Sequence, residues 1–277
     1  MLCVTAEDSY VLVDRPRPRV AVVTLNRPER MNSMAFDVMV PLCDVLNELT
    51  YDNDVRAVVL TGAGRGFSSG ADHKSAGSVP HVDGLTRPSY GLRSMEILDD
   101  VILGLRKMHQ PVIAAVNGAA IGGGLCLALA ADIRVAASGA YFRAAGINNG
   151  LTASELGLSY LLPRAIGSSR AFEIMLTGRD VDAEEAQRIG LVSRTVPEQD
   201  LLDVCCEMAE RIAAFSRPGV ELTKRTLWSG LDAASLEAHM QAEGLGQLYV
   251  RLLTANFEEA VAARKEKRPP VFTDDKP

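Results

Sequence analysis

Three consecutive glycines, Gly122, Gly123 and Gly124, form the segment of this 277-residue chain best suited to chemistry with a ligand. Because glycine has no Cβ atom, a ligand can approach the backbone amides closely there. The apolar run 110–116 before them has the length of a strand, and residues 125–131 after them are typical of a buried helix. The first turn of a helix has N–H groups without intrahelical acceptors, so this junction can bind an oxyanion. The alternative is a turn that needs glycine only for close helix packing.

A second glycine-rich segment, 62–72, follows the apolar and β-branched run 55–61, which predicts another strand. Amides from two such loops, converging on one oxygen, would stabilise an enolate or a tetrahedral anion. Loss of one donor of this kind typically costs about 2.7–4 kcal/mol in the transition state. The two loops together indicate an oxyanion hole more strongly than either does alone.

Two other motifs in the second loop are considered and not favoured. Residues 66–70 read G-x-S-x-G, the elbow that exposes a serine nucleophile, but such a hydrolase needs a later acid and histidine. Only His239 comes late enough, and it lies in a stretch with ordinary helical periodicity. Gly62, Gly64 and Gly66 do not meet the G-x-G-x-x-G spacing of a dinucleotide site.

Composition and charge limit the class of protein. With 47% hydrophobic and 23% charged residues, the chain can bury a full core. The formal charge of -6 argues against a general nucleic-acid or acidic-membrane surface, and no apolar run approaches the length of a membrane span. No leader pattern opens the chain and no C-x-x-C metal spacing occurs, so we expect a cytoplasmic protein with reduced thiols and no metal. The five cysteines are Cys3, Cys43, Cys126, Cys205 and Cys206.

The order of elements predicts an α/β protein. A hairpin of strands 10–13 and 20–25 is expected to turn at 15–18, and a helix capped by Asn32 or Ser33 to run through about Leu49. The other elements expected are a helix at 95–108, a strand at 133–136, a loop at 142–154, a helix from about Glu155, a short helix at 183–189 and a strand at 191–196.

After residue 200 the pattern becomes helical throughout, in contrast to the mixed pattern before it. We therefore expect a core domain at 1–197 and a C-terminal helical region at 198–277. The helices expected in that region span 201–215, 218–229, 235–254 and 256–267.

Several ordered blocks over nearly the whole chain resemble the crotonase superfamily, which includes the enoyl-CoA hydratases and isomerases. Residues 25–33 are similar to the family's L-N-R-P-x-x-x-N-A, residues 67–74 to F-x-x-G-A-D-x-K, and residues 117–124 to N-G-x-x-x-G-G-G. Residues 176–178, 183–186 and 190–192 match a further block in order and spacing. The resemblance implies a spiral of ββα units with a C-terminal helical region that builds homotrimers, often paired into hexamers.

The resemblance also implies an acyl-CoA substrate, with no separate cofactor because CoA is part of that substrate. The backbone amides of Ala71 and Gly123 would form the oxyanion hole for the thioester carbonyl. Basic residues would supply local positive charge for the CoA phosphates, including a tail, 266–268, similar to the family's E-K-R ending. The expected substrate-binding residues are Arg27, Arg30, Ser69, Asp72, His73, Lys74, Gly122 and Lys267.

The chain departs from the hydratases of the family at both catalytic glutamates, where it has Cys126 and Gly146. Hydration requires both an acid and a base, and each such group typically increases the reaction rate by about 10²–10⁴-fold. Glu155 stands where dienoyl-CoA isomerases and peroxisomal-type 3,2-enoyl-CoA isomerases carry their catalytic acid, and one carboxylate can suffice for a double-bond shift. We therefore favour isomerisation of an enoyl-CoA with Glu155 as the catalytic residue.

Other interpretations remain open at this point. The chain is also compatible with an enoyl-CoA hydratase of β-oxidation, a CoA-thioester hydrolase or decarboxylase, or a non-catalytic acyl-CoA binder. Glu155 has a structural alternative as an acidic residue in the first turn of a helix capped by Ser154. Cys126 is either a nucleophile activated by the helix dipole or, as we favour, part of the buried core.

Overall fold

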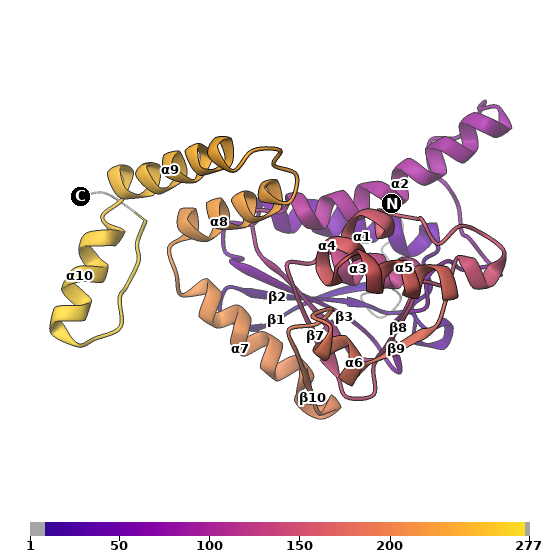
Figure 1. Cartoon of the computed structure of the whole chain (residues 1–277), viewed down its shortest axis with the longest axis horizontal. Helices are drawn as coiled ribbons and strands as arrows, with labels where there is room; N and C mark the ends of the chain where they lie inside the picture. Colours follow the sequence, from indigo (N-terminus) through magenta and orange to yellow (C-terminus); the bar gives the residue numbers. More distant parts are fainter. Residues whose placement is uncertain (1–8, 275–277) are drawn as a thin grey trace.

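The computed structural model describes residues 9–274, and Figure 1 shows the chain as a layered α/β body from which a group of helices extends to one side. The four cysteines within this range, Cys43, Cys126, Cys205 and Cys206, are free thiols, whereas Cys3 lies outside the described residues. Within the same range, no helix is long and apolar enough to cross a membrane.

The larger of two sheets has six strands in the order β1-β2-β3-β5-β7-β10. Its first pair is an antiparallel hairpin, and the remaining neighbours run parallel. The middle strands are almost wholly apolar and buried, as parallel strands are when helices cover both faces. The strands are β1 (Val11–Arg17), β2 (Val20–Leu25), β3 (Ala57–Gly62), β5 (Val112–Val116), β7 (Ile133–Ala137) and β10 (Arg194–Val196).

A smaller sheet has the order β4-β6-β8-β9. Three of its strands each follow a strand of the larger sheet along the chain, and a helix comes next each time, so the fold is the expected spiral of ββα units. The sequence analysis missed these strands because runs of three residues carry no readable periodicity. They are β4 (Gly66–Ser68), β6 (Ala119–Ile121), β8 (Tyr141–Arg143) and β9 (Asp180–Asp182).

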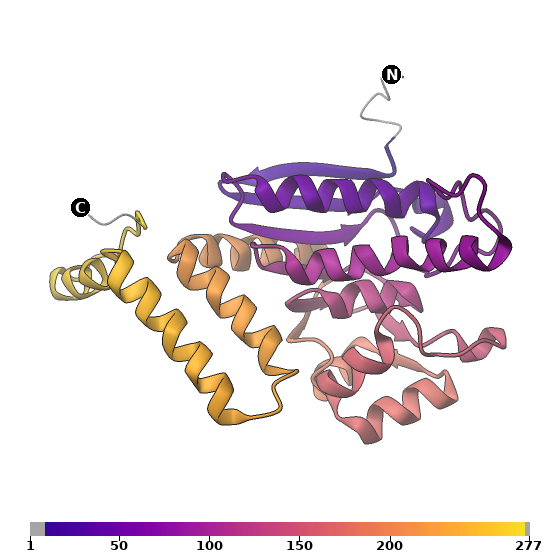
Figure 2. The same ribbon diagram turned by 90° about the horizontal axis from the view of Figure 1, so that it is seen from above.

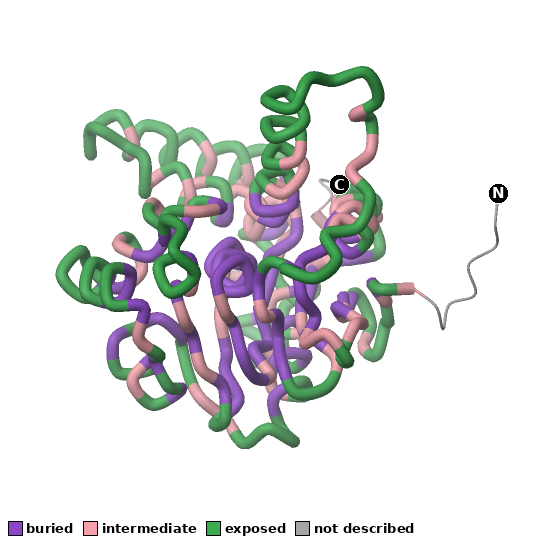
Figure 3. The backbone as a smooth tube through the Cα atoms, turned by 90° about the vertical axis from the view of Figure 1, so that its right-hand side faces the viewer, coloured by how far each residue is buried: buried purple, intermediate pink, exposed green. Residues whose placement is uncertain are grey.

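Helices cover the strands, and in Figure 3 the buried residues gather in the strands and the helix among them. That helix is α3, in which every residue is buried. It contacts α2 and α4, while α7 packs on the larger sheet. The helices are α1 (Phe36–Tyr51), α2 (Arg87–Lys107), α3 (Gly123–Ala130), α4 (Leu158–Ile166), α5 (Ser168–Thr177), α6 (Ala183–Arg188), α7 (Leu201–Ala213), α8 (Arg217–Gly230), α9 (Leu236–Leu253) and α10 (Asn256–Glu266).

Three local expectations were wrong. Strand β1 continues through Arg17 across a bulge, so the turn is at Pro18 and Arg19, at the end of the expected 15–18 segment. Helix α1 begins at Phe36 without a side-chain cap, because Asn32 is engaged elsewhere in the loop. Helix α4 begins at Leu158, not near Glu155, with Gly157 at its N-cap, so neither Ser154 nor Glu155 belongs to its first turn.

The C-terminal helices do not all behave alike. Leu201, Cys205 and Ala209 of α7 are buried in the main core. Helix α8 contacts the body through Lys224 and Trp228, whereas α9 and α10 extend away from the sheet, as Figures 1 and 2 show from two directions. The expected division at residue 197 remains a prediction, and α7, which follows it, packs with the body.

Candidate active site

The two glycine loops that the sequence singled out meet in space. A Cβ atom built on Gly70 would lie 2.6 Å from the carbonyl oxygen of Ile121 and 3.2 Å from the amide nitrogen of Gly123. Gly70 also has a φ of +78°, in the left-handed region that favours glycine. The loop after β4 therefore approaches the start of α3 at backbone contact distance.

The amides of Ala71 and Gly123 are available to a ligand. Ala71 forms an isolated parallel bridge with Met34. The hydrogen bonds of this bridge are made by the residues on either side of Ala71: Met34 N donates to Gly70 O, and Asp72 N donates to Met34 O. Gly123 is the first residue of α3, where an N–H has no intrahelical acceptor. Within residues 9–274, neither amide donates a hydrogen bond. The arrangement has the properties expected of an oxyanion hole.

The three consecutive glycines do not all serve the same purpose. A Cβ on Gly124 would lie 2.1 Å from the carbonyl oxygen of Ser68, so α3 can sit against β4 only with glycine there. Gly122 has a φ of +52° and precedes the helix as its N-cap. The packing interpretation thus applies to Gly124, while Gly123 presents its amide.

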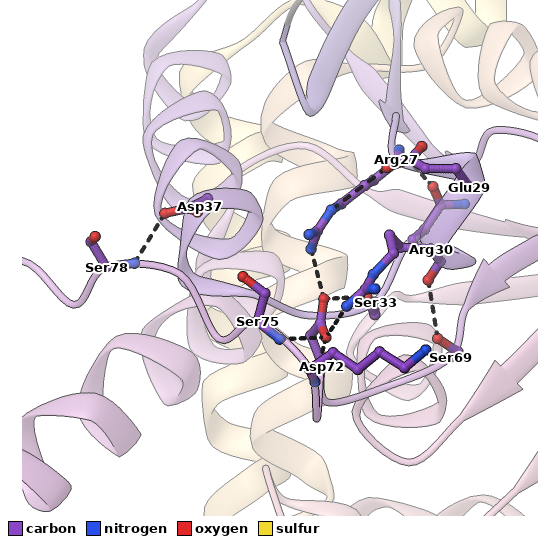
Figure 4. Close-up of polar contacts among 11 residues, drawn as sticks. Arg27, Glu29, Arg30, Ser33, Asp37, Ser69, Asp72, Ser75 and Ser78 are labelled. Carbon is purple, nitrogen blue, oxygen red and sulfur yellow. Dashed lines mark hydrogen bonds and ion pairs between the residues drawn. The ribbon is translucent and has the colours of Figure 1, made fainter.

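Asp72 fixes the loop that carries Ala71. Its carboxylate is 2% exposed and lies 2.9 Å from Arg27 Nη1 and 2.6 Å from Arg30 Nη2. It also accepts from Ser33 Oγ, and the backbone N–H groups of Lys74 and Ser75 donate to Oδ1. Figure 4 shows Arg27, Arg30 and Ser33 pointing at this carboxylate. Three residues expected to bind substrate therefore bind one another.

The charge state of Asp72 follows from these contacts. Burial by itself raises the pKa of a carboxyl group, but the backbone N–H groups of Lys74 and Ser75, together with Arg30 and Ser33, hold the pKa of Asp72 well below its usual range. The carboxylate is consequently ionised throughout the neutral range. Because its oxygens face protein donors, Asp72 serves here to position the backbone of Ala71.

Glu155 lies beside the glycine loop at the start of α3. Its Oε1 atom is 3.1 Å from the position of a Cβ on Gly122, a close contact at a residue whose φ of +52° also favours glycine. The next residue, Leu156, has a φ of +45°, a strained conformation for leucine, and its side chain is buried against Gly123. Burial raises the pKa of Glu155, and the nearby charge of His73 lowers it in part. A half-buried carboxyl group with a raised pKa suits proton transfer.

The two positions where the resemblance predicts the hydratase glutamates hold Cys126 and Gly146, neither of which is a carboxylate. Cys126 is fully buried, and its Sγ donates to Gly122 O at 3.3 Å. Burial raises the pKa of this thiol well above its ordinary value, which favours the core interpretation over the nucleophile. A Cβ on Gly146 would lie 1.9 Å from Thr152 O, so no side chain fits there without movement of the backbone.

The remaining predicted residues are dispersed. Ser69 is held within the loop, its N–H bonded to Met31 O, and Ser68 of the G-x-S-x-G motif is fully buried. His73 and Lys74 are exposed beyond Asp72. Lys267 ends α10, which Figures 1 and 2 place at the opposite end of the molecule from α5. Within the described range, no cluster of three or more His, Cys, Asp or Glu residues is arranged to hold a metal ion.

Sequence reasoning missed two residues of the site and misjudged a third. Met34 places its Sδ atom over Gly123, and Leu156 supports the turn at Glu155; neither position carries a signal readable from residue type. Asn32 was expected to cap a helix. Instead its side chain accepts from Arg27 N and donates to Ala63 O and Gly66 O, which connects the loop after β2 with the loop after β3.

Known proteins similar to this chain identify its family. The family model described as enoyl-CoA hydratase/isomerase matches residues 17–275. The chain belongs to this family. It is 82% identical to the probable enoyl-CoA hydratase EchA12 of Mycobacterium tuberculosis over 96% of this chain and 94% of that protein.

Two solved structures of the enoyl-CoA hydratase/isomerase family are similar to this chain. A probable enoyl-CoA hydratase/isomerase from Mycobacterium abscessus shares 73% identity, with a TM-score of 0.93 over 97% of this chain and 100% of that one. A protein from M. smegmatis described as a monofunctional enoyl CoA isomerase shares 71% identity, with a TM-score of 0.72 over 84% of this chain and 99% of that one. Similar relatives thus carry both hydratase and isomerase names.

Proposed function

We propose that the protein is an enoyl-CoA isomerase that moves a double bond by proton transfer through Glu155. The observation that carries the proposal is the Glu155 carboxylate next to Gly122, at the loop whose Gly123 amide is free, while the Asp72 carboxylate is bound by arginines, Cys126 is a buried thiol and Gly146 leaves no space for a side chain. The similarity to the monofunctional enoyl CoA isomerase supports it.

The proposed reaction needs one base and one oxyanion hole. The Glu155 carboxylate removes a proton from C2 of a 3-enoyl thioester, and the electron pair moves to the carbonyl oxygen. The amides of Ala71 and Gly123 donate to that oxygen while the charge is on it. Protonated Glu155 then returns the proton to C4, the carbonyl re-forms, and the double bond lies between C2 and C3. Atoms and charge balance without a separate cofactor, and CoA enters only as part of the substrate.

The neighbouring groups suit this sequence of steps. The raised pKa of Glu155 brings the base closer to the acidity required for both removal and return of a proton. Asp72 holds the loop of Ala71 in place through Arg27 and Arg30, so the two donors are oriented before substrate arrives. Hydration would need a second acid or base in addition to Glu155. The alternative function is that of a hydratase, which is the activity in the name of a similar relative.

The experiment is an NMR assay in deuterated water with 3-enoyl-CoA and 2-enoyl-CoA, applied to the wild type, Glu155→Gln and Glu198→Gln. Glu198 is exposed and distant from the loops in sequence, so its variant is the matched control. We expect the wild type and the control to form 2-enoyl-CoA with deuterium incorporation. Glu155→Gln should lose about 10²–10⁴-fold in rate. Formation of 3-hydroxyacyl-CoA from 2-enoyl-CoA at a comparable rate would show a hydratase instead.

A further inference from the structure

The amides of Ala71 and Gly123 both lie beyond the ends of paired strands. Strand β4 ends at Ser68 and β6 at Ile121, so the hydrogen bonds of the smaller sheet stop before either amide. Gly70 then approaches the amide nitrogen of Gly123, but a glycine has no side chain that could lock this contact. The separation of the two amides therefore depends on a residue outside both loops.

Met34 holds the first loop through its backbone. Its N–H donates to Gly70 O at 2.7 Å, and its carbonyl oxygen accepts from Asp72 N at 3.3 Å. These two hydrogen bonds flank Ala71, which is the bridge partner of Met34. Because the neighbours of Ala71 make both bonds, the N–H of Ala71 itself is directed away from Met34. The backbone of Met34 thus sets the direction of the first amide.

The side chain of Met34 holds the second loop. A Cβ atom built on Gly123 would collide with Met34 Sδ and would lie 3.2 Å from Met34 Cε, so the thioether lies against the backbone of Gly123. Met34 is 7% exposed and belongs to the main hydrophobic core. An unbranched thioether fills an irregular gap of this kind well. One buried residue therefore contacts both of the loops that carry the amides.

We propose that Met34 is a positioning residue that sets the separation and direction of the Ala71 and Gly123 amides around the carbonyl oxygen of the substrate. The inference rests on the proposed function, in which both amides donate to that oxygen. Met34 acts through the backbone of Gly70 and Asp72 on one side and through Gly123 on the other. A displacement of about 1 Å can cost about 10²-fold in rate, so loss of the thioether should affect turnover more than substrate affinity.

The first test compares the kinetics of Met34→Ala, Met34→Leu and Met39→Ala. Met39 is fully buried in α1, so Met39→Ala is a matched control that removes the same atoms elsewhere in the core and should also lower stability. At a temperature where all variants are folded, we expect Met34→Ala to lower kcat for isomerisation about 10-fold or more, with KM changed by less than about twofold. Met34→Leu, which refills the space, should regain most of the loss. Met39→Ala should keep the wild-type kcat.

The second test does not depend on isomerisation. Butanoyl-CoA, a saturated thioester, is labelled with ¹³C at the carbonyl carbon, and the infrared stretching frequency of this carbonyl is measured when it is bound to each variant. Hydrogen bonds from two amides weaken the C=O bond, so the wild type should lower the frequency relative to the free thioester. Met34→Ala should lose most of this shift, whereas Met34→Leu and Met39→Ala should keep it.

The outcomes separate this inference from the proposed function. A wild-type shift that Met34→Ala keeps in full, or equal losses of kcat in the two alanine variants, would overturn the positioning role alone. A rise in KM without a change in kcat would make Met34 a substrate contact and would also overturn that role. A wild type that does not shift the carbonyl frequency would instead contradict the oxyanion hole, and both the proposed function and this inference would fail.

Discussion

Helices α3 and α9 are both rich in apolar residues, yet they have opposite environments. All eight residues of α3 are buried, between β4 on one side and α2 and α4 on the others. None of the 18 residues of α9 is buried, although Leu236, Leu245 and Leu248 are among its members. Within the single chain, the apolar side chains of α3 are therefore fully covered, whereas those of α9 are covered only in part.

The contrast separates two kinds of apolar surface. Helix α3 begins at Gly123, whose amide we propose as an oxyanion donor, so the packing of this helix also places that amide. Helix α9 leaves large apolar side chains exposed, with Leu245 at 70% and Leu236 at 76% exposure, which is typical of a surface that a second molecule covers. Assembly into a homotrimer or a dimer of trimers, which the family resemblance implies, remains a prediction, and these residues are where it can be tested.

The largest effect is expected from Gly124→Ala in α3. The new Cβ would meet Ser68 O at 2.1 Å, so the free energy of unfolding should fall by about 3 kcal/mol, measured by urea denaturation. Gly244→Ala in α9 is the matched control. Nothing lies within 4 Å of its Cβ position, so this variant should gain about 0.5–1 kcal/mol from helix propensity. A loss in Gly244→Ala would mean that α9 packs against a surface outside the single chain.

A smaller loss, about 2 kcal/mol, is expected from Asp72→Asn, which leaves Arg27 and Arg30 without their carboxylate. The pKa of Asp72 is lowered in the folded state, so its stabilising effect is present above the unfolded pKa of about 3.9 and is lost as pH falls below it. The difference in unfolding free energy between wild type and variant should therefore shrink at acid pH. A difference that is constant with pH would contradict the role of the charge.

Polar substitution on α9 should alter assembly and leave the body intact. Leu245→Gln combined with Leu248→Gln removes two exposed apolar side chains of one helix face. We expect a lower native mass in sedimentation analysis, with the single-chain unfolding free energy within about 0.5 kcal/mol of wild type. Leu92→Gln, at an equally exposed leucine of α2, is the control. An unchanged mass in the double variant would remove α9 from the assembly surface.

The smallest effect is expected at the end of the chain. The guanidinium of Arg268 and the N–H of Val271 lower the pKa of Glu259 to about 2, in an exposed contact that attaches the tail to α10. Glu259→Gln should leave the urea midpoint of the body unchanged and increase the rate of trypsin cleavage after Lys267. Slower cleavage, or a shifted midpoint, would show that the tail is coupled to the body more tightly than these contacts indicate.

The sequence predicted the elements that have a clear period or a strong punctuating residue. The apolar runs of β2, β3 and β5 and the all-apolar α3 were recognised, because parallel strands and a central helix are buried on every side. The cap expected at Asn32 was wrong, since a helix cap and a loop-bridging amide have the same sequence signature. The helix start expected near Glu155 was wrong for a related reason: the chain makes a turn through Leu156 and Gly157 in left-handed conformations first.

By itself, the sequence determined the α/β class, the two glycine loops and the absence of carboxylates at positions 126 and 146, because residue type and spacing carry that information directly. Only the tertiary structure decided that Asp72 turns inward to Arg27 and Arg30, and that Glu155 lies beside Gly122. Contacts between segments far apart in the chain depend on how the sheets and helices pack. The sequence alone therefore cannot distinguish a carboxylate that binds a ligand from one that holds a loop in place, because the partners that decide between these roles come together only in the fold.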